Sequence, residues 1–459
     1  MAHVVVIGGG PAGNQAASRA ASLGARVTVI EKEVVGGAAH LWDCIPSKAM
    51  IATAGALGFS RRMKGLGVSL PAGELGAEAA VDEPNLARRI AEVTTRLQRG
   101  TEELLVSQGV RVLRGEGRLL GPHHVAATAA SGVREVLEAD TVLLSTGSRP
   151  RVPEWAQPDG ERILTTRQAY PPPEMPEHLV VVGSGVTGVE FVHMFSSLGS
   201  RVTLIVSRQH VLPHKDAEVA AALEEELLRR GVHLLKGARA EAVDVDGASV
   251  TVRCDDGRSV RGSHVLLAIG SVPNSANLGL DQAGVEAAAG GYIPVNHHNQ
   301  TNVPHIYAAG DVCGRLPLSS VASMQGRKIA EHMMGLHTRD HRHIDYDKAA
   351  SAIFTEPEIA DVGLAEAEAF ATGRKIRVTK VPFGSSAKAL INDDPRGFVK
   401  IVSDPATGVV LGGCVVGDRA AELISVIALA VTAHLKVTDL ADTCLVHPSL
   451  SEALAEAAE

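Results

Sequence analysis

The stretch Val4-Val5-Val6-Ile7-Gly8-Gly9-Gly10-Pro11-Ala12-Gly13 decides the fold of this chain. Residues 4–7 form a short, apolar and β-branched run, which is typical of a strand buried on both faces of a parallel sheet. A glycine-rich turn follows at once, and the alanine-rich segment after it predicts a helix to about residue 23. A second apolar run at 27–30 completes a strand–helix–strand unit.

The glycine-rich turn indicates what this unit binds. Its glycines permit a tight turn and let the backbone approach a pyrophosphate, which then lies at the positive end of the helix dipole. Glu31 ends the second apolar run, where a carboxylate can accept hydrogen bonds from an adenosine ribose. A generic strand–helix turn is the alternative, but the surrounding pattern favours a dinucleotide-binding fold.

The same pattern recurs later in the chain. An apolar run at 179–182 leads into Gly183-Ser184-Gly185-Val186-Thr187-Gly188, a helix and a second run at 202–206. Each copy is followed by an apolar run that ends in glycine, at Gly147 and at Gly270. Two such copies predict two related nucleotide-binding folds in one chain.

The second copy has no acid at the end of its second strand. Ser207 and Arg208 stand there instead, and a hydroxyl with a guanidinium suits the 2′-phosphate of NADPH better than a bare ribose. The alternative is that Arg208 lies in a solvated loop. We therefore expect NADPH to be preferred, with use of NADH left open.

Composition excludes several classes of protein. The chain has 459 residues and is 45% apolar, which suits a sizeable core in about three domains. Its formal charge of −8 argues against nucleic acid as a partner. Five scattered cysteines argue against a disulfide framework. The sequence has neither a leader-like start nor an apolar run of bilayer length, so we expect a cytoplasmic protein without an integral membrane segment.

The most informative stretch is Gly36-Gly37-Ala38-Ala39-His40-Leu41-Trp42-Asp43-Cys44-Ile45-Pro46-Ser47-Lys48. Together with the two glycine turns, it closely resembles the flavoprotein disulfide reductases, which include dihydrolipoamide dehydrogenase and glutathione reductase. Two further motifs of that family match, TNVPHIYAAGD at 301–311 and HPSLSE at 447–452. The resemblance covers essentially the whole chain and implies FAD in the first fold and NAD(P)H in the second.

The resemblance also implies the domain organisation. We expect an α/β chain with two Rossmann-like dinucleotide-binding domains, for FAD and for NAD(P), and a C-terminal α+β dimerisation domain that makes a homodimer. The first part of the FAD-binding domain is placed at 1–150 and the NAD(P)-binding domain at 151–272. The second FAD-binding part is placed at 273–344 and the dimerisation domain at 345–459.

The redox motif departs from the family. The family places two cysteines there as a disulfide against the flavin, but Ala39 occupies the first position and only Cys44 remains. Electrons must therefore pass from reduced flavin directly to an acceptor, or through a lone thiol. Because Cys44 precedes Ile45-Pro46, which suits the first turn of a helix, the helix dipole would favour a thiolate there. The alternative is an inert packing residue.

Further residues take roles from the resemblance. Lys48 and Glu190 match an ion pair near flavin N5, where the lysine stabilises negative charge and the glutamate orients it beside the nicotinamide. Asp311 matches a ligand of the FAD ribityl chain. The alternatives are a surface lysine, a helix-surface glutamate and a helix-capping aspartate. The expected cofactor-binding residues are Gly8, Gly10, Pro11, Ala12, Gly13, Glu31, Lys32, Gly37, Ala38, Lys48, Gly117, Thr146, Gly147, Gly183, Gly185, Val186, Thr187, Gly188, Glu190, Ser207, Arg208, Gly270, Gly310 and Asp311.

His447 and Glu452 match the family's acid/base histidine and the glutamate that orients it. In the family this histidine reaches the flavin site of the partner subunit. If active here, His447 could protonate a reduced quinone oxygen without any thiol. Alternatively, Glu452 closes a capping box with Ser449, and His447 is structural.

The other clustered histidines are interpreted as solvated loop residues, and no metal site is expected. These are the groups His123/His124, His297/His298 and His341/His343.

Four functions remain open. The broken cysteine pair beside an intact nucleotide apparatus favours an NAD(P)H dehydrogenase that reduces a quinone-like two-electron acceptor, as in the quinone-reductase branch of the family. The second is a soluble pyridine nucleotide transhydrogenase. The third is a dihydrolipoamide dehydrogenase-like disulfide reductase that uses an external thiol. The fourth is a non-catalytic flavin-binding or redox-sensing subunit.

Overall fold

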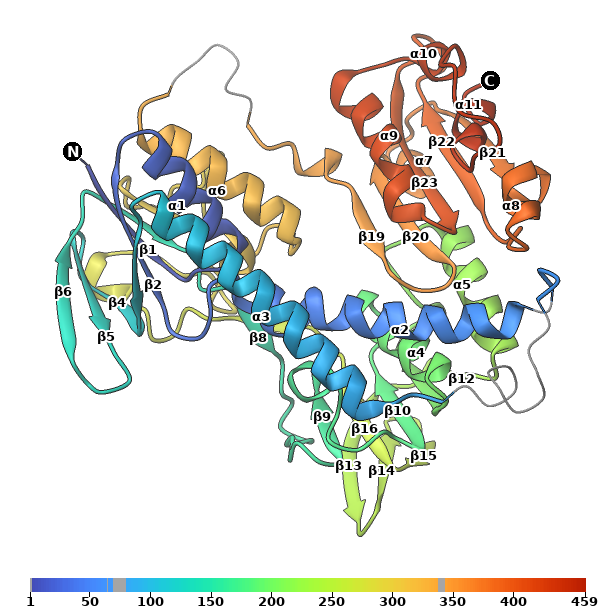
Figure 1. Cartoon of the computed structure of the whole chain (residues 1–459), viewed down its shortest axis with the longest axis horizontal. Helices are drawn as coiled ribbons and strands as arrows, with labels where there is room; N and C mark the ends of the chain where they lie inside the picture. Colours follow the sequence, from blue (N-terminus) through green and yellow to red (C-terminus); the bar gives the residue numbers. More distant parts are fainter. Residues whose placement is uncertain (1, 64, 69–79, 337–342) are drawn as a thin grey trace. The chain divides into compact units, whose positions relative to one another are not determined.

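The computed structural model describes residues 2–63, 65–68, 80–336 and 343–459 (Figure 1). The chain divides into two compact units. Unit 1 comprises Met1–Ala49, Ala87–Arg151 and Gly270–Tyr346, and unit 2 comprises Met50–Leu86, Val152–Ile269 and Asp347–Glu459. The expected α/β fold class with two Rossmann-like sheets and a C-terminal domain is confirmed. The four segment boundaries given above stay a prediction.

Unit 1 is built on a five-stranded parallel sheet around the first glycine turn. Val4 and Val6 face one side and pack against two helices, whereas Val5 and Ile7 face the other side and pack under a three-stranded sheet. This alternation explains why the whole run is apolar. The parallel strands, in spatial order, are β18 (Ile306–Ala308), β7 (Thr141–Leu144), β1 (His3–Ile7), β2 (Arg26–Glu31) and β3 (Arg111–Arg114).

The two helices that cover this sheet are α1 (Pro11–Ser22) and α6 (Ser319–Met333), which lie side by side (Figure 1). Gly326 permits their close approach, since a Cβ there would overlap the Ala12 carbonyl oxygen. The remaining strands of unit 1 are β4 (Glu116–Gly121), β5 (His124–Thr128), β6 (Arg134–Glu138) and the pair β8 (Ser148–Pro150) and β17 (Ser271–Pro273). Two helices are divided between the units: α2 (Ile45–Arg62) passes into unit 2 at Met50, and α3 (Glu83–Ser107) passes into unit 1 at Ala87.

Unit 2 repeats the parallel sheet around the second glycine turn. Val180 and Val182 pack against a three-stranded sheet, as Val5 and Ile7 do in unit 1. The parallel strands are, in spatial order, β12 (His233–Lys236), β11 (Arg201–Val206), β10 (His178–Val182), β16 (His264–Leu267) and β9 (Ile163–Thr165). The small sheet contains β13 (Ala240–Asp246), β14 (Ser249–Cys254) and β15 (Ser259–Gly262), and the helices are α4 (Val186–Ser197) and α5 (Ala217–Arg229).

The C-terminal part of unit 2 has its own antiparallel sheet. The apolar helix α9 (Ala420–Ala433) buries Ile424 and Ile427 against it. None of the described helices is long and apolar enough to cross a membrane. The strands and remaining helices are β19 (Ser351–Ile353), β20 (Glu358–Gly363), β23 (Val410–Gly417), β22 (Phe398–Ser403), β21 (Arg377–Pro382), α7 (Glu366–Ala371), α8 (Ala387–Ile391), α10 (Val437–Ala441) and α11 (Glu452–Glu456).

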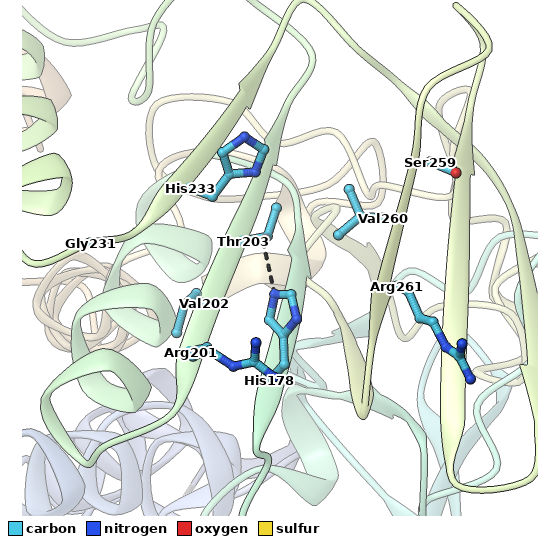
Figure 2. A pocket seen from close by; sticks show the side chains of 9 residues that line it. All are labelled: His178, Arg201, Val202, Thr203, Gly231, His233, Ser259, Val260 and Arg261. Atoms are coloured by element: carbon cyan, nitrogen blue, oxygen red, sulfur yellow. Dashed lines mark hydrogen bonds between the residues drawn. The ribbon is translucent and has the colours of Figure 1, made fainter.

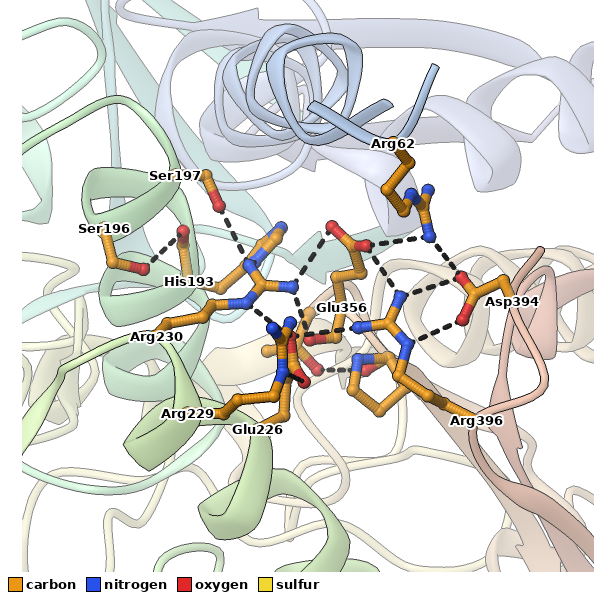
Figure 3. Close-up of polar contacts among 12 residues, drawn as sticks. Arg62, His193, Ser196, Ser197, Glu226, Arg229, Arg230, Glu356, Asp394 and Arg396 are labelled. Carbon is orange, nitrogen blue, oxygen red and sulfur yellow. Dashed lines mark hydrogen bonds and ion pairs between the residues drawn. The ribbon is translucent and has the colours of Figure 1, made fainter. Parts of the chain in front are cut away.

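A charged network ties distant segments of unit 2 together (Figure 3). Arg396 contacts Asp394 at 2.6 Å, Glu356 at 2.9 Å and Glu226 at 3.0 Å. Arg230 reaches the same Glu226, at 2.6 Å. Burial raises the pKa of Glu226, but hydrogen bonds from Arg229 and Arg230 outweigh it and hold the pKa at about 2.

Candidate functional site

The first glycine turn forms a cradle at the start of α1. Gly8 has φ +102, and a Cβ on Gly13 would overlap the Gly8 carbonyl oxygen, so the strand and helix meet too closely for any side chain. Apart from Gly10 itself and its two chain neighbours, no described residue has an atom within 4 Å of where a Cβ on Gly10 would be. Among the described residues, no side chain caps α1, which leaves its first-turn amides available to an anionic ligand.

The Gly36-Gly37 stretch lies directly on this turn. The Gly36 amide donates to the Gly9 carbonyl at 2.7 Å. Gly37, with φ +57, approaches so closely that a Cβ there would stand 3.0 Å from the Gly10 Cα atom. The glycine-rich segments at 8–10 and 36–37 thus lie directly against each other. Ala38 is the N-cap of the helical turn that follows.

Glu31 ends β2 beside the cradle and is 7% exposed. Its Oε2 accepts the Gly9 amide at 2.6 Å and its Oε1 accepts the Glu33 amide at 2.7 Å. Burial raises the pKa of this carboxyl, and the two amides oppose that effect only in part. Each oxygen has a further lone pair for a ribose hydroxyl. Lys32 lies at the exposed rim, 3.9 Å from Glu116.

The other residues expected at FAD come from several segments of unit 1. Thr146 Oγ1 donates to the Asn274 carbonyl at 2.8 Å, and the Asn274 amide donates to the Gly147 carbonyl at 3.0 Å. Ser148 donates to Asp311 Oδ2 at 2.6 Å. Asn274 and Ser148 were not among the residues found from the sequence.

Three further expected glycines have defined surroundings: Gly117 and Gly310, and Gly270, which follows the corresponding strand β16 of the second copy. A Cβ on Gly117 would collide with the Ile7 side chain, which fixes the approach of β4 to the parallel sheet. The Gly270 carbonyl accepts the Arg151 amide at 2.9 Å. Gly310 opens the 3₁₀ turn η4 (Gly310–Cys313), and its amide donates to Gln325 Oε1 at 2.7 Å. An anion cradle, a ribose-type carboxylate and Asp311 together fit a dinucleotide such as FAD.

The positions of the expected redox pair are joined by a turn of π-helix, η1 (Ala39–Asp43). The Cys44 amide donates to the Ala39 carbonyl, and α2 begins at the next residue. The half-buried thiol of Cys44 lies 3.2 Å from the Ser319 hydroxyl. The sequence predicts the helix after Cys44 but neither the π-helical turn before it nor Ser319.

Lys48 lies one helical turn beyond Cys44. Its amide donates to the Cys44 carbonyl at 3.1 Å, so the two residues are neighbours one helical turn apart at the start of α2. The ammonium group of Lys48 in α2 thus follows one helical turn after the thiol of Cys44.

The second glycine turn repeats the first in unit 2. Gly183 has φ +108, and a Cβ on Gly188 would overlap the Gly183 carbonyl oxygen. Gly185, Val186 and Thr187 are exposed at the start of α4. This turn therefore leaves a second helix N-terminus accessible to a phosphate-containing ligand.

Two residue groups flank this second turn. Ser207 and Arg208 are exposed and follow β11, which ends at the same sheet edge because Val182 pairs with Ile205. Glu190 is 7% exposed on α4, and its Oε1 accepts the Phe354 amide at 2.9 Å. The contact with Phe354 could not be found from the sequence, since the two residues lie far apart in the chain.

A hollow of about 410 Å³ lies at the opposite edge of this sheet (Figure 2). His178, Arg201 and His233 each begin a strand there, whereas the glycine turn follows the end of β10. His178 Nε2 lies 2.9 Å from Thr203 Oγ1, and burial followed by the charges of Arg201 and His233 lowers the pKa of His178. The hollow is therefore separate from the sheet edge that carries the second glycine turn.

His447 and Glu452 are in contact near the C-terminus. His447 Nδ1 lies 2.7 Å from Glu452 Oε1, and the imidazole is 74% exposed. The Ser449 amide donates to Glu452 Oε2 at 2.8 Å. Glu452 thus holds the histidine with one oxygen and a backbone amide with the other. The N-cap of α11 is Ser451, not Ser449, so only the glutamate half of the expected capping box forms.

Comparison with known families matches nearly the whole chain. Residues 2–326 match the model described as pyridine nucleotide-disulphide oxidoreductase. Residues 349–458 match the dimerisation domain of pyridine nucleotide-disulphide oxidoreductases.

Individual relatives are similar over their full length. An NAD(P)H dehydrogenase (quinone) from Mycobacterium tuberculosis is 44% identical, over 99% of this chain and 93% of that protein. A dihydrolipoyl dehydrogenase from Zymomonas mobilis is 33% identical, over 99% of this chain and 96% of that protein. The crystal structure of LpdA from Mycobacterium tuberculosis superimposes with a TM-score of 0.94 at 43% identity, covering 100% of this chain and 99% of that chain.

Proposed function

The chain belongs to the pyridine nucleotide-disulphide oxidoreductases, a family that uses FAD and NAD(P)H, and from that premise we propose that it is an FAD-dependent NAD(P)H dehydrogenase that reduces a quinone-like acceptor. The observation that carries the proposal is Ala39 on the π-helical turn that leads to Cys44. Because alanine has no sulfur, this turn cannot hold the disulfide that a dithiol relay needs. The 44% identical relative is named as a quinone-dependent NAD(P)H dehydrogenase, which supports the same function.

The residues of the first glycine turn would hold FAD. The amides at the start of α1 bind the pyrophosphate, Glu31 accepts from the adenosine ribose, and Asp311 holds the ribityl chain. Bound FAD would supply a carrier that accepts hydride from NAD(P)H and gives two electrons to the acceptor. We assign it to segments 1–150 and 273–344 of the chain.

The second glycine turn would hold the nicotinamide nucleotide, in segment 151–272. Ser207 and Arg208 favour NADPH, because a guanidinium and a hydroxyl can both donate to its 2′-phosphate. NADH would bind through the same turn without that contact. Glu190, buried at α4, would orient the nicotinamide side of the site.

Cys44 and Lys48 would act at the flavin ring. From the start of α2, Lys48 would stabilise negative charge as the ring is reduced. Cys44 would serve as a lone thiolate donor to the ring, stabilised by Ser319. Neither role forms or breaks a disulfide.

His447 would supply a proton to the reduced acceptor oxygen, with Glu452 fixing the ring orientation and tautomer. We propose that segment 345–459 forms a homodimer, which would bring His447 to the acceptor site of the partner subunit. The match to the dimerisation domain supports this assembly.

A disulfide reductase of the dihydrolipoyl dehydrogenase type is the second candidate. The His447–Glu452 contact favours it, because this pair would serve thiol exchange equally well. It would require a thiol from outside the motif.

A transient-kinetic experiment separates these functions. The purified flavoprotein is reduced with NADPH without oxygen and then mixed in parallel with benzoquinone, an NAD analogue and lipoamide. We expect rapid reoxidation by the quinone and slow reoxidation by the other two. Reoxidation by lipoamide alone would establish the second candidate, and reoxidation by the NAD analogue alone would indicate a transhydrogenase. Flavin that NADPH does not reduce would exclude all three enzymes.

A further inference from the structure

Three histidines of unit 1 converge at one place on its surface. His297, His298 and His343 each offer a ring nitrogen, and these nitrogens all lie within 4.8 Å of one another. Their ring centroids are 4.2 to 4.7 Å apart. The sequence interpretation as solvated loop residues does not anticipate this convergence. His341, grouped with His343 in the sequence, lies outside the described residues.

The turn that carries the first two histidines is fixed by its own hydrogen bonds. Asn296 Oδ1 accepts the His298 amide at 2.9 Å and the Gln300 amide at 3.0 Å. The Asn299 amide donates to the Asn296 carbonyl at 3.0 Å, and Asn299 itself has φ +61. The directions of His297 and His298 are therefore set by a compact asparagine-based turn.

His298 is further held by aromatic packing. Its ring stacks on His332, with centroids 4.2 Å apart and planes inclined by 23°. His332 Nδ1 in turn lies 2.8 Å from the hydroxyl of the buried Tyr307. His298 is half-buried, whereas His297 and His343 are exposed, so one ring of the three is fixed and two can adjust.

The segment that carries His343 is anchored close by. Tyr346 follows three residues later, and its hydroxyl lies 3.4 Å from Asn299 Oδ1. The same hydroxyl accepts Nε2 of the buried Gln325 at 3.0 Å. Tyr346 thus holds this segment against the turn that presents His298.

We propose that His297, His298 and His343 form a binding site for a divalent metal ion such as Zn²⁺ or Cu²⁺. Neutral imidazole is the usual ligand of these ions. With metal–nitrogen bonds of about 2.0–2.1 Å, ligand nitrogens in a tetrahedral site are roughly 3.4 Å apart. The nitrogens now lie within 4.8 Å of one another, and rotation of the two exposed rings toward His298 would bring them closer to that separation. Water completes the coordination, since the cluster opens to solvent.

This site is independent of the proposed quinone reduction, because it shares no residue with the glycine turns, Cys44 or His447. A bound ion would join the turn at 296–300 to the segment at 343–346. An ion that binds only the folded chain stabilises it, so occupancy is expected to raise the melting temperature.

Metal titration of the FAD-loaded protein tests the proposal. The protein is prepared without a histidine tag, treated with a chelator, and titrated with Zn²⁺ against a chromophoric chelator at pH 7.5. We expect one tight equivalent per chain and a higher melting temperature. His297→Ala and His343→Ala should each weaken binding at least about tenfold, as even an outer contact of a metal site costs that much. Cu²⁺ bound to the wild type should show superhyperfine splitting from three nitrogens in its electron paramagnetic resonance spectrum.

His123→Ala is the matched control. It removes one ring of a stacked histidine pair in the same unit, with centroids 4.0 Å from His305, and should leave binding unchanged. The exposed positions of His297 and His343 let both variants fold, which an unchanged melting temperature without metal would verify. Wild-type affinity no greater than that of a His297/His298/His343 triple alanine variant would overturn the proposal. So would an equal loss in His123→Ala.

Discussion

The thiol of Cys44 lies 3.2 Å from the hydroxyl of Ser319 at the first residue of α6. Position 39 holds alanine and offers no second thiol, but the Cys44 thiol has a hydroxyl neighbour from a segment far along the chain. Ser319 can donate to a thiolate or accept from a thiol, so it can stabilise either form. The contact with Ser319 therefore bears on the charge-transfer absorbance that Cys44 would produce with the flavin, which spectroscopy can measure.

Replacing Cys44 should abolish long-wavelength charge-transfer absorbance in the oxidised flavoprotein. In Cys44→Ser no thiolate can donate to the flavin, and in Ser319→Ala the band should weaken because the thiolate loses a hydrogen-bond donor. Absorbance spectra of the FAD-loaded variants measure both effects. Cys444→Ser, which changes an exposed cysteine, should keep the band. A band that persists in Cys44→Ser would contradict the assignment.

Arg208→Ala should reduce kcat/KM for NADPH about tenfold to a hundredfold, because a charge-assisted hydrogen bond to phosphate contributes about 1.5–3 kcal/mol. NADH carries no 2′-phosphate, so its kcat/KM should change little. Steady-state kinetics with both nucleotides and one quinone give the ratio. Arg253→Ala, an exposed arginine in the same unit, is the control. An equal loss for NADPH and NADH would refute the role of Arg208.

The two glycine turns and their strands could be predicted from sequence because their causes are local. Gly8 and Gly183 adopt a positive φ, and Gly13 and Gly188 have no room for a Cβ. Each of these constraints is visible as a glycine in the sequence. The absence of the first redox cysteine could also be recognised from sequence, since it depends only on finding Ala39 at that place in a short motif.

The partners contributed by distant segments could not be predicted. Ser319 meets Cys44, and Phe354 meets Glu190, through contacts that exist only once the sheets and helices have packed. The convergence of His343 with His298 belongs to the same class. None of these three pairs has a short spacing or a periodic pattern that would reveal it.

Glu190→Ala should slow flavin reduction by NADPH and also reduce stability. The buried carboxylate accepts the Phe354 amide at 2.9 Å, and loss of such an acceptor costs about 1–3 kcal/mol. Glu190→Gln keeps an oxygen for that amide and removes only the charge. We therefore expect slow reduction in both variants by stopped flow, with near-normal urea stability only in Glu190→Gln. Normal reduction rates in Glu190→Gln would show that the charge has no part in the reaction.

Glu452 should stabilise the protein in a pH-dependent way. The Ser449 amide and then His447 lower the pKa of this carboxyl from its ordinary value of 4.5. The contribution is thus fully present above about pH 4.5 and is lost as the pH falls through the lowered value. The difference in free energy of unfolding between wild type and Glu452→Gln should therefore shrink on acidification from pH 6 to pH 3. A difference that is constant across this range would contradict the prediction, and Glu456→Gln provides a control on the same helix.

Arg396→Met should destabilise the chain by about 3 kcal/mol, the lower end of the cost of breaking a buried ion pair. The lower end applies because Arg396 is 29% exposed and because Arg229 and Arg230 still contact Glu226. Glu226 has a pKa of about 2 against an ordinary 4.5, so its stabilisation is present above pH 4.5 and is lost toward pH 2. Without Arg396 the acid transition should begin at a higher pH.

Urea denaturation at pH 7 and at pH 4 measures both effects of Arg396→Met. Arg419→Met changes an arginine that is 74% exposed and should have little effect. An Arg396→Met/Asp394→Leu double variant distinguishes pairing from packing, because it removes both charges of the closest pair. If pairing dominates, the double variant should lose less than the sum of the two single losses, because each single change already removes the Arg396–Asp394 contact, while Arg62 still contacts Asp394 at 2.6 Å in Arg396→Met. If the double variant loses the sum of the two single losses, the arginine stabilises the chain through its packing and not through its charge.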